Sequence, residues 1–296
     1  MLLNAVIWNF DPTAFKIGSM EIRWYSLLFA LAFIVSYLIL KKFVFDKEKI
    51  PVNYLDKLAF YIFIGVFIGA RLGHCLFYEF SYYSNHIAEM ILPIKQTEDG
   101  IKLTGYQGLA SHGGAIGILI AVWFYYKRTG IPMLWTLDRL VIIVALAGVF
   151  IRLGNLANSE IYGIATNSDW GFIFVRDHDF IPKHPTQLYE AGAYLLCFVV
   201  LFFLFLFLKK KDSLAPGFLF SLFLILVFSF RFIIESVKEV QEAWEADMIL
   251  NMGQILSIPF ILLGIVILIM SLKGMTGKKL DISKLKLTPD KSNKKK

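Results

Sequence analysis

Eight polar side chains of the sequence lie within or beside long apolar stretches, where such groups are costly. An ionisable group at the centre of a membrane-spanning helix costs about 2.5–3.5 kcal/mol, so each one requires a functional or pairing explanation. The set is Arg71, His112, Arg152, Asn155, Glu160, Glu190, Arg231 and Glu235. Guanidinium groups bind phosphate through paired hydrogen bonds, and a histidine can accept a proton near neutral pH. These residue types predict a site that holds an anionic phosphate and moves a proton.

The spacing of these residues places them on shared helix faces. Arg152 and Asn155 are three positions apart, and Arg231 and Glu235 are four positions apart, so each pair lies on one face of a helix. Taken alone, Arg231 and Glu235 could be an ion pair that only allows the helix to insert. Taken together with Arg152 and His112, they favour a functional site inside a helical bundle.

Glycines follow His112 directly, at positions 113, 114 and 117. Small residues allow helices to approach each other closely, so helix packing is one interpretation of Gly113, Gly114 and Gly117. The other is the close approach of a lipid headgroup to backbone N–H groups at the start of a helix. The sequence leaves both open.

The elements that carry these residues are predicted to be membrane-spanning helices. Hydrophobic residues make up 57% of the 296 positions and aromatic residues 16%, more than a soluble domain normally contains. About seven stretches are long enough to cross roughly 30 Å of hydrocarbon, the third and fourth being the least clearly defined. They lie near residues 22–40, 57–80, 110–126, 137–157, 188–208, 217–236 and 252–272. We therefore predict an all-α integral membrane protein with a polytopic transmembrane domain at 1–272 and a lysine-rich, disordered cytoplasmic tail at 273–296.

The distribution of charge predicts the orientation. Of the 30 basic residues, 20 lie in three alternate connections and the tail, which the positive-inside rule assigns to the cytoplasm. The connection after residue 236, which combines Lys238 with several acidic residues, is then on the outer side. The N-terminus is predicted to be periplasmic and the C-terminus cytoplasmic. The polar residues, together with Tyr25, then lie near the outer ends of their helices.

The net charge of +7 does not indicate a nucleic-acid partner, because membrane topology accounts for most of the basic residues. Cys75 and Cys197 lie inside apolar stretches without metal-binding spacing, so we expect them to be packing residues. No cluster of metal ligands is visible, and no metal or cofactor is predicted.

Several segments together resemble the bacterial prolipoprotein diacylglyceryl transferases, over nearly the whole chain except the tail. They are GLASHGGAIG at 108–117, RLGNLANSEIYG at 152–163, HPTQLYE at 184–190, RFIIE at 231–235 and MGQ at 252–254, and RWY at 23–25 is similar to the first motif of that family. Two positions depart from the family pattern. Gln107 and Ser159 stand where the family has glycine.

The resemblance implies transfer of the diacylglyceryl group of phosphatidylglycerol to the thiol of the lipobox cysteine in a prolipoprotein, with release of glycerol phosphate. Arg152 and Arg231 would hold the departing phosphate. His112 would deprotonate the thiol, with Tyr25 as a second possibility. The expected partners are phosphatidylglycerol, the prolipoprotein lipobox peptide and membrane lipids, at the periplasmic face of the bacterial inner membrane.

The resemblance also implies supporting roles for other residues. Asn155 and Glu160 would orient headgroup hydroxyls, and Glu190 and Glu235 would hold either the arginines or the substrate hydroxyls. The remaining substrate-binding residues implied are Gly113, Gly114 and Gly163.

Two other classes of protein also place charged residues inside a helical bundle. A lipid transporter or flippase usually binds its substrate at the membrane midplane between pseudo-repeats, a pattern that this sequence lacks. A structural scaffold would not explain three arginines at matching depth. The role of Arg71 stays open between headgroup binding and pairing with an acidic neighbour such as Glu79.

Overall fold

The structure is a computed structural model that describes residues 5–18, 20–92, 94–97, 100–103, 108–178, 180–239, 248–277, 279–282 and 285. The chain divides into two compact units. Unit 1 consists of residues 1–44 and 137–279, and unit 2 of residues 45–136 and 280–296.

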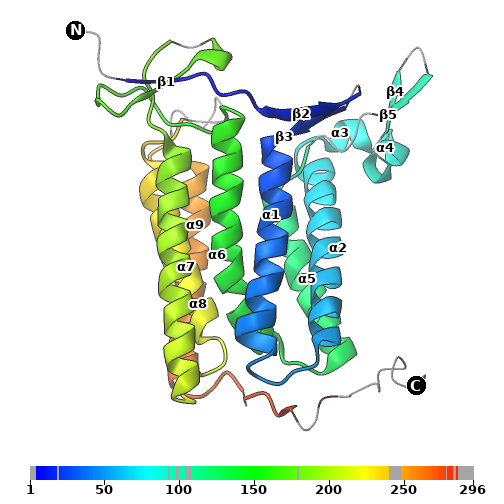
Figure 1. Cartoon of the computed structure of the whole chain (residues 1–296), viewed down its shortest axis with the longest axis vertical. Helices are drawn as coiled ribbons and strands as arrows, with labels where there is room; N and C mark the ends of the chain where they lie inside the picture. The colour runs from blue at the N-terminus through cyan, green and yellow to red at the C-terminus, as the bar shows by residue number, and fades with distance from the viewer. Residues whose placement is uncertain are drawn as a thin grey trace. The chain divides into compact units, whose positions relative to one another are not determined.

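The helices of unit 1 are long and apolar. They are α1 (Trp24–Ile39), α6 (Met133–Ala157, whose first four residues belong to unit 2), α7 (Thr186–Lys210), α8 (Phe218–Glu235) and α9 (Met252–Leu272). Helix α8 packs against both α7 and α9 (Figure 1). A π-helix, Leu40–Phe45, continues α1. Helix α8 therefore connects α7 and α9 within the helical bundle of unit 1.

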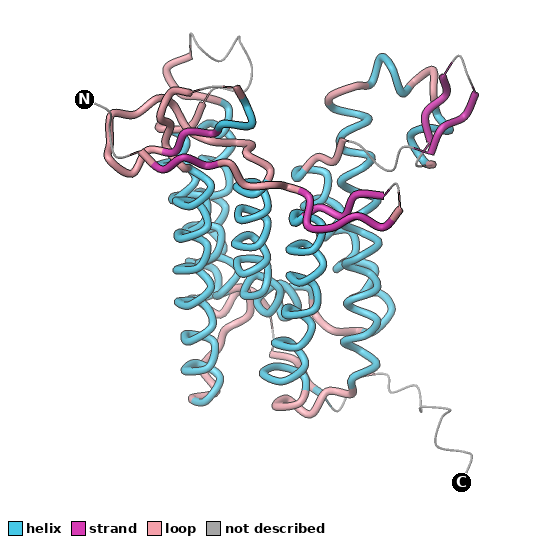
Figure 2. Tube along the Cα trace, turned by 45° about the horizontal axis from the view of Figure 1, so that its top comes forward, coloured by secondary structure: helices cyan, strands magenta, loops and turns pink. Residues whose placement is uncertain are grey.

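Short strands, which the sequence did not predict, lie where α1 and α7 begin and α6 ends (Figure 2). Strand β1 (Val6–Trp8) pairs in parallel with β6 (Phe172–Phe174), and β2 (Thr13–Ile17) forms an antiparallel hairpin with β3 (Met20–Arg23). A 3-10 helix, Val175–Asp177, follows β6. The Trp8 indole Nε1 donates to the carbonyl of Leu156, 3.0 Å away, and so ties β1 to the last turn of α6.

The start of α8 is held by a carboxylate from α6. The two oxygens of the Asp138 side chain accept hydrogen bonds from the backbone N–H groups of Gly217, at 2.7 Å, and Phe220, at 2.9 Å. Asp138 is fully buried. A carboxylate satisfies the unpaired donors of a helix N-terminus and complements its dipole, so Asp138 fixes α8 against α6.

The start of α9 is joined to the end of α8. Asn251 and Gln254 form a reciprocal capping box at the first turn of α9. Their side-chain amides also donate to α8, from Asn251 to the Glu235 carbonyl at 3.0 Å and from Gln254 to the Phe232 carbonyl at 3.3 Å. These bonds give structural roles to the Met252–Gln254 motif.

Unit 2 is built on α2 (Val52–Phe77) and α5 (Ser111–Thr129), which pack along each other. The shorter elements are α3 (Phe80–Tyr83), α4 (Ile87–Ile91) and the antiparallel hairpin of β4 (Ile94–Thr97) and β5 (Gly100–Leu103). Glycines make the contact between α2 and α5. A Cβ atom added to Gly117 would lie 1.9 Å from the Gly65 oxygen, and one added to Gly113 would lie 2.1 Å from the Gly69 oxygen. The packing interpretation therefore holds for these two glycines.

Arg71 holds α4 against α2. Its guanidinium donates to the carbonyls of Glu89, at 2.7 Å, and Met90, at 3.2 Å, and to the Tyr83 hydroxyl at 3.3 Å. It also lies over the Tyr83 ring. These contacts give Arg71 a structural role besides the headgroup binding and the acidic pairing considered from the sequence. Glu79, named there as a neighbour, contacts His74 at 3.5 Å.

The prediction of an all-α, multi-pass membrane fold is confirmed. Among the described residues six helices are long and apolar enough to cross a membrane, α1 with its π-helical extension, α2, α6, α7, α8 and α9. Helix α5, with its polar first turn and its basic last turn, is not one of them. The count of seven spans is therefore not confirmed, and the orientation stays a prediction.

The predicted boundary at residue 272 coincides with the end of α9. The division into domains at 1–272 and 273–296 stays a prediction, and residues 278, 283–284 and 286–296 of the tail lie outside the described residues. The same is true of Gln107 and of the acidic residues of segment 240–247.

We expect Gly117→Ala to lower the thermal stability of the purified protein in detergent, because its Cβ would meet backbone atoms of α2 that cannot move aside. Overpacking of this kind costs about 1–3 kcal/mol. Gly114→Ala is the matched control, since its Cβ would meet nothing closer than the Ala70 Cβ at 3.8 Å. Equal unfolding temperatures for the two variants would contradict the close contact of α2 with α5.

Candidate active site in unit 1

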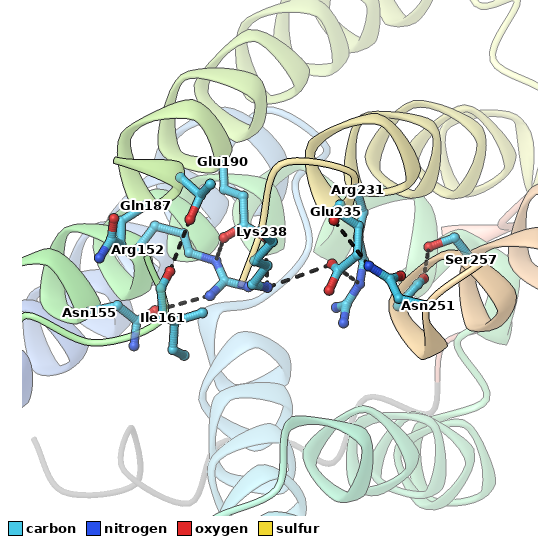
Figure 3. Close-up of polar contacts among 12 residues, drawn as sticks. Arg152, Asn155, Ile161, Gln187, Glu190, Arg231, Glu235, Lys238, Asn251 and Ser257 are labelled. Carbon is cyan, nitrogen blue, oxygen red and sulfur yellow. Dashed lines mark hydrogen bonds and ion pairs between the residues drawn. The ribbon is translucent and has the colours of Figure 1, made fainter. Parts of the chain in front are cut away.

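A continuous series of ion pairs connects α6, α7 and the end of α8 (Figure 3). Arg152 Nε lies 2.8 Å from Glu190 Oε2, and Lys238 Nζ lies 3.6 Å from both Glu190 Oε1 and Glu235 Oε2. Glu235 Oε2 lies 3.9 Å from Arg231 Nε. We call these five residues the charge network. Lys238 is the link between its two arginine–glutamate pairs.

The members of the charge network differ in burial. The side chains of Glu190 and Lys238 are 1% and 4% exposed, and that of Arg231 is 25% exposed. Buried charges are stable only when they are paired, which explains why the most buried members stand in the middle. Among the described residues, the pair with Glu235 is the only hydrogen bond or ion pair of Arg231. Within the described part of the chain, its guanidinium therefore keeps N–H donors that a ligand could use.

Amide side chains extend the charge network from Arg152. Arg152 Nη1 donates to Asn155 Oδ1 at 3.2 Å, and Asn155 Nδ2 donates to Glu160 Oε1 at 2.8 Å. The Asn158 amide donates to the same Glu160 oxygen at 3.2 Å. Since an amide has one acceptor end and one donor end, Asn155 can serve both charged neighbours at once.

The turn that carries Glu160 is strained. Ser159, with φ +56°, and Ile161, with φ +60°, both adopt the left-handed conformation that favours glycine. The first turn of α7 holds this turn in place, because Gln187 Nε2 donates to the Glu160 carbonyl at 2.8 Å and Thr186 Oγ1 to the Ile161 carbonyl at 3.0 Å. The departure at Ser159 therefore falls where a glycine would relieve strain.

Gly163 brings Lys238 to the charge network. The two residues face each other in an antiparallel bridge, and the Ile164 N–H donates to the Val237 carbonyl at 3.0 Å. A Cβ atom on Gly163 would lie 2.4 Å from the Val237 oxygen. Only glycine lets the segment after Glu160 pass this close to the backbone that carries Lys238.

Glu235 lies over Gly253 of α9. A Cβ atom on Gly253 would lie 2.3 Å from the carboxyl carbon of Glu235. The Glu235 backbone carbonyl also accepts a hydrogen bond from the Asn251 amide. The start of α9 therefore positions both the carboxylate and the backbone of Glu235. The spacing of Glu235 from Arg231 alone did not reveal this support.

Tyr25, at the start of α1, also belongs to this site. Its ring packs against Gly154 of α6, where a Cβ atom would lie 2.6 Å from the ring. Tyr25 interacts electrostatically with Glu160 and Arg152. Unit 1 thus brings together seven of the predicted site residues. They are Tyr25, Arg152, Asn155, Glu160, Glu190, Arg231 and Glu235, with Gly163 beside them.

The other predicted site residues belong to unit 2. His112 is exposed in the first turn of α5, whereas Gly113 and Gly114 are buried there. The structure therefore describes the arginine site and the histidine in separate units.

Lys238 is the site residue that the sequence did not predict, because it was counted among the charges of an outer connection. A signal was present, since Lys238 follows Arg231 and Glu235 at spacings that continue one helix face. The structure shows that this face persists just beyond the end of α8.

The charges of this site favour an anionic ligand. The charge network contains three cations and two carboxylates, an excess of one positive charge. Glu160 reaches it only through the Asn155 amide. An excess of one positive charge suits a phosphodiester, which carries one negative charge, and within the described ranges Arg231 keeps donors for it. No group of three potential metal ligands occurs within the described ranges.

Fold and site together define a multi-pass α-helical membrane protein with a buried arginine site suited to a phosphate group. The sequence profile of the prolipoprotein diacylglyceryl transferase family matches residues 12–270. The chain belongs to this family.

Curated relatives agree over almost the whole chain. The phosphatidylglycerol–prolipoprotein diacylglyceryl transferase of Bacteroides fragilis is 46% identical over 265 residues, which cover 89% of this chain and 94% of the relative. The proteins of the same name from Tolumonas auensis and Porphyromonas gingivalis are 45% and 43% identical. They share 90% and 95% of this chain, and 98% and 100% of their own lengths.

We expect Ser159→Gly to raise the thermal stability of the purified protein. The change removes a left-handed strain of about 1 kcal/mol. It also removes a buried hydroxyl that has no hydrogen-bond partner in the described part of the chain. Ser84→Gly is the control, because Ser84 has φ −61° and is exposed, so the added backbone freedom should slightly destabilise the protein. If Ser159→Gly lowered the unfolding temperature as well, the turn would not be strained.

Proposed function

We propose that this protein transfers the diacylglyceryl group of phosphatidylglycerol to the thiol of the lipobox cysteine in a prolipoprotein, and releases glycerol phosphate. Membership of the family and the names of the relatives, which contain both substrates, support this activity rather than lipid transport. The observation that carries the proposal is the charge network, in which two arginines share an excess of one positive charge.

The arginines would act on the phosphate. The thiolate attacks the terminal glycerol carbon of the diacylglycerol, and the bond from this carbon to the phosphate oxygen breaks with its electron pair on oxygen. The phosphate thereby gains negative charge as it departs. Positive donors aimed at that charge stabilise the transition state more than the ground state. Arg231, which has available N–H donors, and Arg152, held by Glu190, would supply this stabilisation.

The thiol must lose its proton before or during the attack, because the ordinary pKa of a cysteine is about 8.5. His112 would be the base, and its exposure in the first turn of α5 supports this role. Tyr25 remains the second candidate. Its packing against Gly154, two residues from Arg152 on α6, favours a role near the phosphate end of the substrate.

The other residues would support binding. Glu190 and Glu235 contact the arginines, which favours the holding role over direct contact with substrate hydroxyls. Asn155 and Glu160 would orient the headgroup hydroxyls. The Asn155 and Asn158 amides both donate to Glu160 Oε1, so Oε2 of Glu160 could accept a hydrogen bond from a substrate hydroxyl. Gly163 would act through Lys238. Gly113 and Gly114, which the resemblance implies as substrate-binding residues, would do so from the first turn of α5, beside His112.

The site would face the periplasm in the bacterial inner membrane, with the N-terminus outside and the C-terminus in the cytoplasm. The positive connections and the gathering of polar residues at the end of α6, the start of α7 and the end of α8 support this orientation. An exported prolipoprotein and the outer-leaflet lipid could meet there.

Arg152→Ala and Arg231→Ala should each lower transfer by about 10²–10³-fold or more, because each removes positive charge from the departing phosphate. The measurement is the mass increase of a lipobox peptide incubated with purified protein and phosphatidylglycerol, together with the released glycerol phosphate. Arg176→Ala is the control, because Arg176 forms an exposed ion pair with Asp11 in the same unit. Near-normal turnover of either arginine variant would exclude its role at the phosphate.

His112→Gln should lose rate at neutral pH and recover part of it as the pH rises toward 9. The thiol then ionises without a base, which makes the histidine less necessary. The pH profile of the same peptide assay measures this effect, with wild type as the reference. A defect of equal size at every pH would instead indicate that His112 binds substrate or supports the structure.

A further inference from the structure

Lys238 lies three residues beyond α8, in a position set by backbone contacts. The bridge to Gly163 and the hydrogen bond from the Glu239 N–H to the Tyr162 carbonyl, at 3.3 Å, hold this segment. The Lys238 side chain is 4% exposed and turns toward the two carboxylates (Figure 3). A lysine this deeply buried has lost most of its hydration, so its neighbours must compensate for it.

Both arginine–glutamate pairs meet at Lys238. Its Nζ lies 3.6 Å from an oxygen of Glu190 on α7 and 3.6 Å from an oxygen of Glu235 on α8. Within the described residues, no other ion pair joins these two carboxylates. Lys238 is therefore a shared counterion for two buried carboxylates that would otherwise have only the arginines.

A phosphate bound to Arg152 and Arg231 neutralises part of the positive charge that compensates Glu190 and Glu235. If the arginines were the only counterions, binding of the phosphate would leave two buried carboxylates less compensated. A lysine ammonium is a compact charge without the fork geometry of a guanidinium, so it can lie between two carboxylates and bind neither of them in a bidentate manner. The arginines, with their planar forks, are better suited to phosphate.

We propose that Lys238 is a positioning residue, the counterion that holds Glu190 and Glu235 while Arg152 and Arg231 donate to the substrate phosphate. This proposal rests on the proposed function and deepens it. Lys238 supplies the cation that gives the charge network its net positive charge, and it contacts the carboxylates rather than the substrate. Without Lys238, the same residues would carry no net positive charge.

Burial holds the pKa of the Lys238 ammonium below its usual range, and the charges of Arg152 and Arg231 lower it further. Glu190 and Glu235 raise the pKa and so oppose this effect. The geometry with a carboxylate on either side stabilises the charged form, which is the form that a counterion requires.

The test is steady-state kinetics of the full chain with phosphatidylglycerol in mixed micelles and a lipobox peptide. Lys238→Met keeps the volume of the side chain and removes its charge. We expect the KM for phosphatidylglycerol to rise about 10- to 100-fold, with a smaller change in kcat and an unchanged KM for the peptide. Lys238→Arg keeps the charge and should stay close to wild type in the KM for the lipid.

Lys183→Met is the matched control. Lys183 is a second buried lysine of unit 1, paired with Glu239 at 3.0 Å and placed over the Tyr162 ring. Its loss should leave the KM for the lipid within about threefold of wild type. An equal rise in both lysine variants would show a general packing effect and overturn the proposal.

A double variant tests the charge balance directly and covers the case in which Lys238→Met does not fold. Lys238→Met with Glu235→Gln removes one cation and one carboxylate, so the positive excess returns. We expect this variant to fold and to reverse most of the rise in the KM for phosphatidylglycerol that Lys238→Met causes. If Lys238→Met is unstable, we expect the double variant to have a KM for the lipid within about tenfold of wild type. No recovery, or an unchanged KM in Lys238→Met, would overturn the role of Lys238.

The wild type separates this inference from the proposed function. If the wild type transfers no diacylglyceryl group to the peptide, the proposed function fails. If the wild type is active and Lys238→Met retains the same KM for phosphatidylglycerol, only the role of Lys238 fails.

Discussion

A charged side chain inside a membrane-spanning bundle has little water around it, so protein groups of opposite charge must solvate it. Unit 1 meets this requirement with one connected set of partners drawn from α6, α7 and α8. Arg152 and Glu190 are in close contact, whereas the contacts toward Arg231 are longer and Arg231 is the most exposed member. The network is therefore tightest in its buried part and loosest where a ligand could enter.

The surrounding structure serves to hold this network. The strained turn at Ser159 and Ile161 aims Glu160 and its amide partners, and the first turn of α7 keeps that turn closed. Gly163 allows the backbone to approach Lys238, and Gly253 leaves room for the Glu235 carboxylate. These positions have no chemistry of their own, yet they explain why the motifs extend beyond their charged residues.

Local spacing made much of this predictable. The helices agree with the apolar stretches within a few residues, and the Arg152–Asn155 and Arg231–Glu235 contacts follow from positions three and four apart. The features that the sequence did not predict depend on contacts between distant segments. The parallel pairing of β1 with β6 joins segments far apart in sequence, and strands of three residues carry no readable alternation.

Lys238 continues the helix face of Arg231 and Glu235, but its burial depends on a backbone bridge to Gly163 that no local pattern encodes. The glycines after His112 had two interpretations from the sequence. Only the partners on α2, Gly65 and Gly69, give Gly117 and Gly113 a packing role. For Arg71 the sequence did not reveal that its donors bind the carbonyls of α4.

The carboxylate of Asp138 at the start of α8 has a geometric consequence for the arginines. Fourteen residues separate Asp138 from Arg152 on α6, and fourteen separate Gly217, which donates to Asp138, from Arg231 on α8. Both helices run toward the same end of unit 1, and each advances about 21 Å over that interval. The interval from Asp138 to Arg152 is therefore equal in length to the interval from Gly217 to Arg231. One residue inserted or deleted within either interval would shift one arginine by about 1.5 Å along its helix and turn it by about 100°. These two segments are therefore matched in length, and an insertion can be accommodated only outside them.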